Sequence, residues 1–329
     1  MENNRIIESI ERADYLVSKL LGVKPGEEVL IAIDPQTDMR MANACAAAAL
    51  RCGAEYSISM MPIRGKDKAL TFPKTLELAM EACDVFIGMT AASGAAIYNN
   101  RLKELIIEKR LREASVVLRT IDNFTRGGAL ADYEKVYTDG VKLQSIWRGK
   151  KHAHITTPAG TDLHMEMNQM EPIIECGIAR NPGDAMAFSD GEVSIGPVIG
   201  STYGKLVIDG PICYYGKPSI PVELRIEEGR IVEVVGGDAN ICKEIRRQIA
   251  EIKDSDNIAE IGPACMFNGD FEEEKKAMGT CHIAMGNGYY YGQPARSSVH
   301  IDMVQYDPTI IFDGELIVKD GKVVCLGYK

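Results

Sequence analysis

The sequence predicts an α/β fold in which an N-terminal doubly wound α/β domain is followed by a β-rich domain. Strand and helix patterns alternate over residues 1–145, whereas short strands with alternating side chains dominate residues 146–329. A chain of 329 residues is also longer than one hydrophobic core usually supports. We therefore expect a Rossmann-like scaffold domain over 1–145 and a second domain over 146–329.

The N-terminal half begins with a helix. Apolar side chains recur every three or four residues over 5–21, which predicts one buried helical face. The apolar run Val29–Ile33 predicts a buried strand of a parallel sheet. The same alternation then continues with helices at 38–52, 74–82 and 101–112 and strands at 56–60, 85–89 and 115–119. The turn at 34–38 has no glycine, so a pyrophosphate could not approach its backbone closely, and we expect a scaffold rather than a nucleotide site.

The C-terminal half has a different pattern. Its predicted strands are short and alternate apolar with polar residues, and one helix is expected near 238–252. At the end of the chain, Asp313-Gly314 and Asp320-Gly321 separate three such strands. Two-residue Asp-Gly links between alternating runs are strong signals of β-hairpins.

Composition excludes several classes of function. The formal net charge is −10 and the basic residues form no stripe, so we expect neither nucleic-acid nor membrane binding. The nine cysteines include no C-x-x-C pair, which is typical of a reducing compartment. There is no signal-peptide pattern and no run of eighteen apolar residues, so a cytoplasmic location is expected.

Two histidines in the last third could bind a metal. In a strand, His300 and Asp302 project from one face, about 7 Å apart at the backbone. His282 lies in the apolar stretch 280–285, and Gly286-Asn287-Gly288 then leads to Tyr289, whose phenol could stabilise a developing oxyanion. The alternatives are a solvated edge strand for His300 and Asp302, and a core histidine bonded to backbone for His282.

Three glutamates could complete such a site. Glu192 and Glu260 lie in apolar surroundings, where a carboxylate is costly unless it is paired or bound to metal. Glu274 is included because it precedes the strand of His282, with a charged loop or the start of a helix over 272–274 as the alternative. The alternative for Glu192 and Glu260 is the solvent face of a strand. Mixed nitrogen and oxygen ligands suit Zn²⁺, Co²⁺ or Mn²⁺, and bridging carboxylates favour a centre of two divalent metal ions.

The remaining histidines carry a weaker signal. His152 and His154 alternate in a strand that follows two lysines, and His164 follows a turn. We expect all three to be surface residues rather than ligands.

At these positions the sequence resembles the M29 family of metallo-aminopeptidases, the aminopeptidase T and aminopeptidase S group, which are leucyl aminopeptidase-like. The resemblance rests on His282 followed by Tyr289, on Ser297-x-x-His300-x-Asp302, and on Glu260 and Glu192 in their strands. It implies a two-metal hydrolase that removes N-terminal residues from small peptides and is usually a homodimer. The implied metal ligands are Glu192, Glu260, Glu274, His282, His300 and Asp302. Glu260 is also the implied base, and Tyr289 the implied group that stabilises the tetrahedral intermediate.

Two alternatives remain open. The ring-cleaving 2,5-dihydroxypyridine dioxygenase is similar to this family, and His282, His300 and Asp302 could supply its mononuclear iron site. The presence of Glu192 and Glu260 favours the aminopeptidase, since a 2-His-1-carboxylate site does not need them. The other alternative is an inactive binding relative, in which the unusual segment Tyr290–Arg296 would block the pocket.

Overall fold

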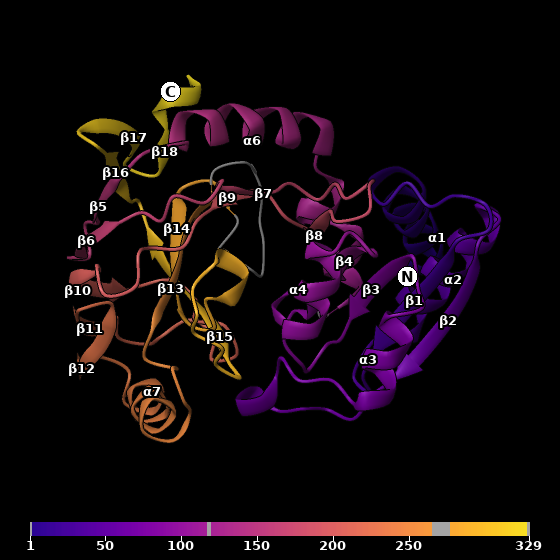
Figure 1. The fold of residues 1–329 in the computed structure, drawn as a ribbon, viewed down its shortest axis with the longest axis horizontal. Coiled ribbons are helices and arrows are strands. Elements are labelled where there is room, and N and C mark those ends of the chain that lie inside the picture. The colour runs from indigo at the N-terminus through magenta and orange to yellow at the C-terminus, as the bar shows by residue number, and fades with distance from the viewer. Residues whose placement is uncertain (1, 117–119, 265–276, 328–329) are drawn as a thin grey trace. The chain divides into compact units, whose positions relative to one another are not determined.

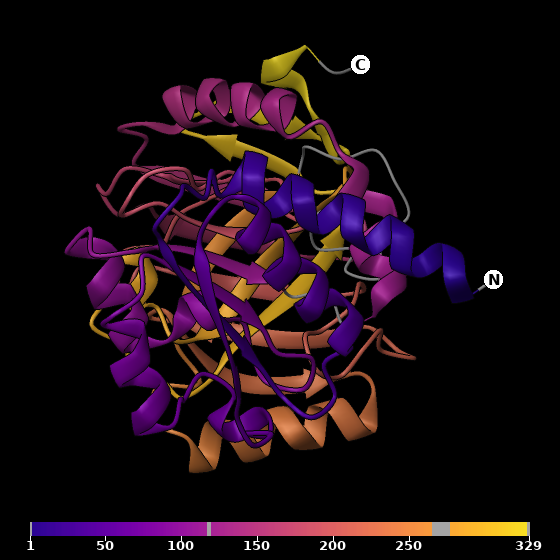
Figure 2. The same ribbon diagram turned by 90° about the vertical axis from the view of Figure 1, so that its right-hand side faces the viewer.

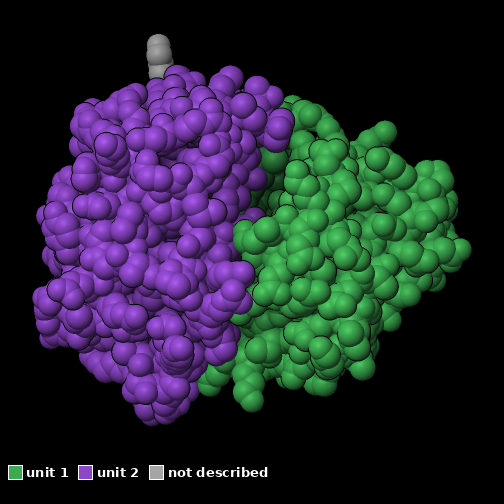
Figure 3. Space-filling view, viewed as in Figure 1, with its two compact units in different colours: residues 1–134, 175–190 green, residues 135–174, 191–329 purple. Residues whose placement is uncertain are grey.

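The computed structural model describes residues 2–116, 120–264 and 277–327. The chain forms two compact units, coloured separately in Figure 3: Met1–Glu134 with Glu175–Asp190, and Lys135–Ile174 with Gly191–Lys329. The sequence places one boundary near residue 145. In the structure the chain enters unit 2 at residue 135 and returns to unit 1 for residues 175–190.

Unit 1 is built on a parallel sheet of five strands in the order β2-β1-β3-β4-β8 (Figure 1). The strands are β1 (Glu28–Ile33), β2 (Glu55–Met60), β3 (Val85–Met89), β4 (Arg112–Val116) and β8 (Ala185–Phe188). The first four follow the predicted order of strands and helices, but β4 begins at Arg112, three residues before the predicted strand 115–119, because the helix before it ends earlier than predicted. The fifth comes from beyond residue 145, because the chain returns to pair β8 with β4.

Helices connect these strands. They are α1 (Glu2–Asp14), which is indigo in Figure 2 and continues as a π-helix at Tyr15–Leu20, α2 (Met39–Arg51), α3 (Lys74–Met80) and α4 (Asn100–Ile107). Side-chain caps begin two of them: Asp38 accepts from the backbone N–H of Arg40 in α2, and Asn99 accepts from that of Leu102 in α4. Residues of α3 and α4 pack with Leu30 of β1 in one buried cluster.

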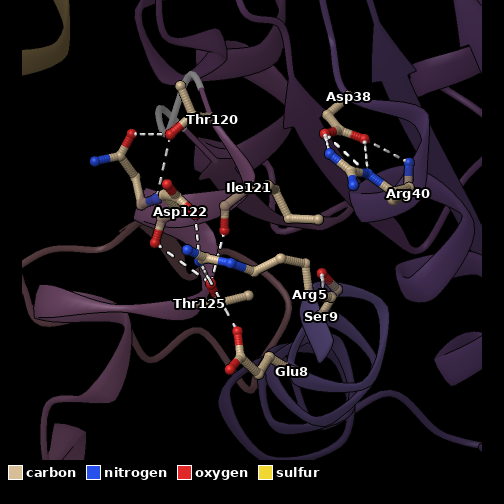
Figure 4. A network of polar contacts seen from close by, with 10 residues as sticks. Arg5, Glu8, Ser9, Asp38, Arg40, Thr120, Ile121, Asp122 and Thr125 are labelled. Carbon is tan, nitrogen blue, oxygen red and sulfur yellow. Dashed lines mark hydrogen bonds and ion pairs between the residues drawn. The ribbon is translucent and has the colours of Figure 1, made fainter. Parts of the chain in front are cut away.

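A polar network joins α1 to α5 (Ile121–Thr125) within unit 1 (Figure 4). The guanidinium of Arg5 forms an ion pair with Asp122 and donates to the hydroxyl of Thr125 at 3.3 Å. The same hydroxyl donates to the carbonyl of Ile121 at 2.8 Å. α5 is therefore tied to the first helix. The next helix, α6 (Tyr133–Trp147), leads from unit 1 into unit 2.

Unit 2 contains two antiparallel sheets. One has eight strands in the order β12-β11-β10-β6-β5-β16-β17-β18, and the other has five in the order β15-β14-β13-β9-β7. The larger sheet comprises β5 (His152–Thr156), β6 (Asp162–Glu166), β10 (Tyr203–Ile208), β11 (Val222–Glu227), β12 (Arg230–Gly236), β16 (Thr309–Phe312), β17 (Glu315–Lys319) and β18 (Lys322–Val323). The smaller comprises β7 (Ile173–Glu175), β9 (Glu192–Ser194), β13 (Ile258–Ala264), β14 (Thr280–Gly286) and β15 (His300–Tyr306). One helix, α7 (Ala239–Glu251), interrupts these strands, and Asp238 caps it.

Single helical turns occur at Lys66–Lys68, Ala96–Tyr98, Gly127–Leu130, Tyr289–Tyr291 and Val324–Leu326. The predicted Asp-Gly hairpins at the C-terminal end are confirmed. Asp313 and Asp320 have φ of 48° and 47°, and each is followed by a glycine with positive φ, as a two-residue hairpin turn requires. The fold is thus mixed α/β, with one parallel and two antiparallel sheets. Within the described part of the chain, no helix combines the length and apolar character needed to span a membrane.

Candidate metal centre

Three neighbouring strands of the smaller sheet of unit 2 carry the predicted histidines and two of the carboxylates. Glu260 of β13 and Asp302 of β15 both pair with Ala284 of β14, which places the three residues in one row across the sheet. Because side chains alternate along a strand, His282 projects from the same face as Ala284, and His300 from the same face as Asp302. The strand register therefore brings together residues that are up to 42 positions apart in the sequence.

Glu192 joins this group from β9. Its backbone pairs with that of Ala264 at the end of β13. Nδ1 of His282 lies 3.4 Å from Oε2 of Glu192. Of the six predicted metal ligands the structure thus brings together five. The sixth, Glu274, lies outside the described residues.

Small residues make room for the imidazoles. Gly262 pairs with His282 across β13 and β14, and a Cβ atom on Gly262 would lie 2.3 Å from Cε1 of the ring. Gly286 pairs with His300 and has φ of +105°. A Cβ atom there would lie 2.3 Å from the carbonyl oxygen of Val299. Glycine is required at both positions, because a side chain would collide with the ring at one and with the backbone at the other.

The carboxylate of Glu260 is the centre of the group. Its Oε1 lies 3.2 Å from Nε2 of His282, and its Oε2 lies 3.0 Å from Nε2 of His300. Nε2 of His300 also lies 3.2 Å from Oδ1 of Asp302. All of these side chains are buried, and the most accessible of them, Asp302, is only 5% exposed.

The donor atoms fit a metal ion. In two sets of three residues, all ligand atoms lie within 4.8 Å of one another: Glu192 with Glu260 and His282, and Glu260 with His300 and Asp302. Among the described residues, Nδ1 of His282 and Oε2 of Glu192 have no hydrogen-bond partner. A buried carboxylate without such a partner is costly unless a cation is near. Imidazole nitrogens and carboxylate oxygens are ligands that borderline divalent metals accept.

The buried carboxylates favour positive charge between the side chains of Glu260, His282 and His300. Burial raises the pKa of Glu260, but the two imidazoles outweigh it and bring the pKa to about 2. Burial lowers the pKa of His282 and His300, but the neighbouring carboxylates outweigh it and raise each pKa to about 9. The carboxylates of Glu192, Glu260 and Asp302 therefore stabilise the protonated, positively charged forms of His282 and His300. A bound metal ion would supply the positive charge in place of those two protons.

The backbone carbonyl of Asn287 orients His300. Nδ1 of His300 donates to this oxygen at 2.8 Å, so Nε2 faces Glu260. The side chain of Asn287 holds the loop by donating to the carbonyl of Ser297 and accepting from the N–H of Tyr289, each at 2.9 Å. Such partners fix the tautomer and direction of a metal-binding histidine. The Gly286-Asn287-Gly288 segment was the available signal in the sequence, but it predicted no role for Asn287.

Tyr289 begins the helical turn that follows β14. Its side chain is half-buried, and the guanidinium of Arg296 lies 3.6 Å from the centre of its ring. Tyr291 is 1% exposed, and its ring centre lies 6.2 Å from that of His300. A direct role of Tyr289 in the chemistry stays a prediction.

The fold and the site together define an α/β protein with a buried cluster of imidazoles and carboxylates that could hold metal. The family model described as 2,5-dihydroxypyridine 5,6-dioxygenase matches residues 15–325. The chain therefore belongs to the 2,5-dihydroxypyridine 5,6-dioxygenase family. Among curated proteins, no match was found.

Solved structures show the same fold. The 2,5-dihydroxypyridine dioxygenase from Pseudomonas putida KT2440 is 18% identical, with a TM-score of 0.78 and 96% of each chain covered. Wild-type AmpT from Thermus thermophilus is 15% identical, with a TM-score of 0.64, covering 96% of this chain and 99% of that one. The resemblance to the M29 aminopeptidases is thus confirmed as a relationship of fold.

The predicted activity is wrong. We expected a hydrolase, a metallo-aminopeptidase using zinc or cobalt, whereas the family that covers nearly the whole chain is a dioxygenase family. The inference relied on Glu192 and Glu260 to favour hydrolysis. Both are buried beside the histidines in a chain of the dioxygenase family, so their presence does not discriminate between the two chemistries. One scaffold hosts both.

Proposed function

We propose that this protein is a metal-dependent dioxygenase that opens the ring of a hydroxylated pyridine such as 2,5-dihydroxypyridine. The observation that carries the proposal is the convergence of two Nε2 atoms, from His282 and His300, on the buried carboxylate of Glu260. Membership of the 2,5-dihydroxypyridine 5,6-dioxygenase family supports the reaction class. The β-rich unit is accordingly the proposed metal-binding domain.

The proposed metal is a single divalent iron ion. His282, His300 and Asp302 would hold it, with the carboxylate of Glu260 between the two imidazoles. Two histidines and one carboxylate are the ligands of many non-haem iron oxygenases. Such an iron ion, when bound, supplies the means to bind and activate O₂ beside an electron-rich ring.

The residues around the ligands position them. Glu192 faces Nδ1 of His282, and the carbonyl of Asn287 accepts from Nδ1 of His300, so each imidazole turns its Nε2 toward Glu260. Each ring is thereby held at both of its nitrogens by neighbouring oxygens. Pre-oriented ligands of this kind raise metal affinity and leave less reorganisation for the reaction.

Burial is the second contribution of the protein. Glu260 and His282 are 0% exposed, and Ile261 and Ile283 on the opposite face of the same strands are also fully buried. Water is therefore excluded on both sides of this part of the sheet. A dry site strengthens the electrostatic interactions in it and protects a reactive intermediate from hydrolysis.

Oxygen uptake tests the proposal. Protein loaded anaerobically with Fe²⁺ is mixed with 2,5-dihydroxypyridine and O₂. We expect one O₂ consumed per ring lost, with both atoms of ¹⁸O₂ in the product because a dioxygenase inserts both. His300→Ala and Asp302→Asn should reduce the rate by about 100-fold or more, whereas the exposed His152→Ala should not change it. Iron-loaded wild-type protein that consumes no O₂ with hydroxylated pyridines would overturn the proposal.

Peptidase activity is measured in parallel as a comparison. Amino-acid p-nitroanilides are offered to the same iron-loaded protein and to protein supplied with Zn²⁺ or Co²⁺. We expect no hydrolysis that His300→Ala abolishes. The homodimer remains a prediction, and the oligomeric state of the active protein is measured by light scattering in the same preparation.

A further inference from the structure

A second cluster of possible metal ligands lies on the larger sheet of unit 2. His154 of β5 pairs directly with His164 of β6, and Asp162 lies two residues before His164 on the same face. On the next strand, Tyr203 of β10 pairs with His164. The opposite face of these strands is apolar and buried, as Ile155 and Leu163 are 0% exposed. The two histidines and Asp162 therefore project from the accessible face.

The distances between the possible ligand atoms are close to those in a metal site. Nε2 of His154 lies 2.8 Å and Nε2 of His164 lies 3.5 Å from the same atom, Oδ1 of Asp162. All three ligand atoms lie within 4.8 Å of one another. In a tetrahedral zinc site the ligand atoms lie about 3.3 Å apart, because zinc–ligand bonds are about 2.0–2.2 Å long. The two measured distances lie on either side of that value.

Ring stacking holds the imidazoles in register. The rings of His154 and His164 are 3.9 Å apart and nearly parallel, and the ring of Tyr203 stacks on His164 at 5.2 Å. The strand pairing and Tyr203 thus hold both histidines on one face with their rings parallel. Because the Nε2 lone pair of an imidazole lies in the plane of the ring, the two rings must tilt toward each other for both Nε2 atoms to bind one ion.

From this geometry we propose that His154, His164 and Asp162 form a surface binding site for a late first-row divalent transition-metal ion, with Zn²⁺ as the ion to test. Two imidazoles and one carboxylate leave one position for water in a four-coordinate ion. The site is distinct from the candidate iron centre, which lies on the other sheet of unit 2 and is buried. His154 and His164 are partly exposed, as expected of surface residues, and the proposal adds a ligand role to them.

The charges nearby are compatible with a cation. Oδ1 of Asp162 lies 2.8 Å from Nε2 of His154 in a hydrogen bond. Lys205 pairs with Asp162 across β10 and β6. Its flexible ammonium can move into solvent when a metal binds, since the site is exposed.

Retention on a Zn²⁺-charged chelating resin tests the site selectively, because the resin reaches an exposed histidine pair but not the buried centre. Protein without an affinity tag is compared with His154→Ala, His164→Ala and the control His152→Ala, which removes an exposed histidine of the same strand. We expect wild type and His152→Ala to be retained and the other two variants to pass through. Equal retention of all four proteins, or loss of retention in His152→Ala as well, would overturn the proposal.

Equilibrium dialysis against Zn²⁺ provides the second measurement. Wild type should bind one more Zn²⁺ per chain than His154→Ala, whatever the buried centre binds, since both proteins retain that centre. Asp162→Asn should weaken this extra site about ten-fold, the lower end of what loss of a carboxylate beside a ligating imidazole costs. The same stoichiometry in wild type and His154→Ala would contradict the site. Because oxygen uptake does not enter either measurement, failure here is independent of the proposed dioxygenase.

Discussion

Gly262 and His282 face each other across β13 and β14 so closely that a single methyl group on Gly262 would lie 2.3 Å from the imidazole. The ring of His282 occupies the space that a side chain would otherwise fill. From there its Nε2 reaches Oε1 of Glu260 at 3.2 Å. The position of one glycine thus sets the position of a proposed metal ligand.

Gly262→Ala should displace His282 and damage the centre. We expect iron affinity to fall by about ten-fold or more and the free energy of unfolding to fall by about 1–3 kcal/mol, the usual cost of overpacking a core. Gly236→Ala on β12 is the matched control, because a Cβ atom there has no neighbour within 4 Å among the described residues. Iron titration and urea unfolding of both variants measure the effects. Unchanged iron binding in Gly262→Ala would contradict the role of this glycine.

Glu260→Gln removes the carboxylate on which both imidazoles converge. In the metal-free protein this breaks a buried charged pair, and we expect a loss of about 3–5 kcal/mol in the free energy of unfolding at neutral pH. Iron affinity should fall as well, since the amide carries no charge. The exposed Glu166→Gln is the control and should change stability by less than about 0.5 kcal/mol. Equal stability of the two variants would show that Glu260 is not paired as described.

Asn287→Ala should loosen His300 without removing a proposed ligand. The substitution deletes the bonds to Ser297 and Tyr289 that hold the carbonyl accepting from His300. We expect iron affinity to fall by about 10–100-fold, the range found when a partner of a metal-binding histidine is lost. Asn287→Ser retains a side-chain oxygen that can accept from the N–H of Tyr289 without adding a buried charge, and should have a smaller effect. An iron titration of both variants is the test. A lower iron affinity in Asn287→Ser than in Asn287→Ala would contradict the proposed support of His300.

Glu113 of β4 should make the stability of the protein depend on pH. Burial raises its pKa to about 8, although the hydroxyl of Ser115 and the N–H of Met186 oppose the rise. The folded protein therefore binds a proton that the unfolded chain releases near its ordinary pKa of about 4.3. Stability should fall as pH rises from that value through about 8, at about 1.4 kcal/mol for each pH unit at most.

Glu113→Gln should remove this dependence, because the amide stays neutral at every pH. At pH 9 the variant is expected to be more stable than wild type by roughly 4 kcal/mol, and near pH 5 the two should be similar. Urea unfolding across the pH range measures the difference. The exposed Glu108→Gln should behave as wild type does. A parallel decline of wild type and Glu113→Gln above pH 5 would exclude Glu113 as the source.

Most strands and helices were predictable because the residues that form each of them are close together in the sequence. The apolar run Val29–Ile33 forms β1, and the Asp-Gly links form hairpins, each from residues that are close in sequence. β8 was not predictable in this way. Its pairing with β4 joins residues about 70 positions apart, and neither segment contains a signal of the other.

The candidate site was predictable to a similar degree. Alternation along β15 correctly placed His300 and Asp302 on one face, and the apolar neighbours of Glu260 correctly indicated burial. The support from Asn287 depends on a loop conformation that alternation does not encode. The chemistry was predicted wrongly, since imidazoles and carboxylates serve both hydrolysis and oxygen activation, and the difference lies in the metal and the substrate.

The central claim is that His282, His300 and Asp302 hold iron beside Glu260. Anomalous diffraction at the iron edge, from crystals grown anaerobically with Fe²⁺, tests it most directly. We predict one strong peak within about 2.0–2.3 Å of Nε2 of both histidines and of an oxygen of Asp302. Iron-saturated crystals with no peak there, and with both imidazoles still hydrogen-bonded to Glu260, would contradict the claim.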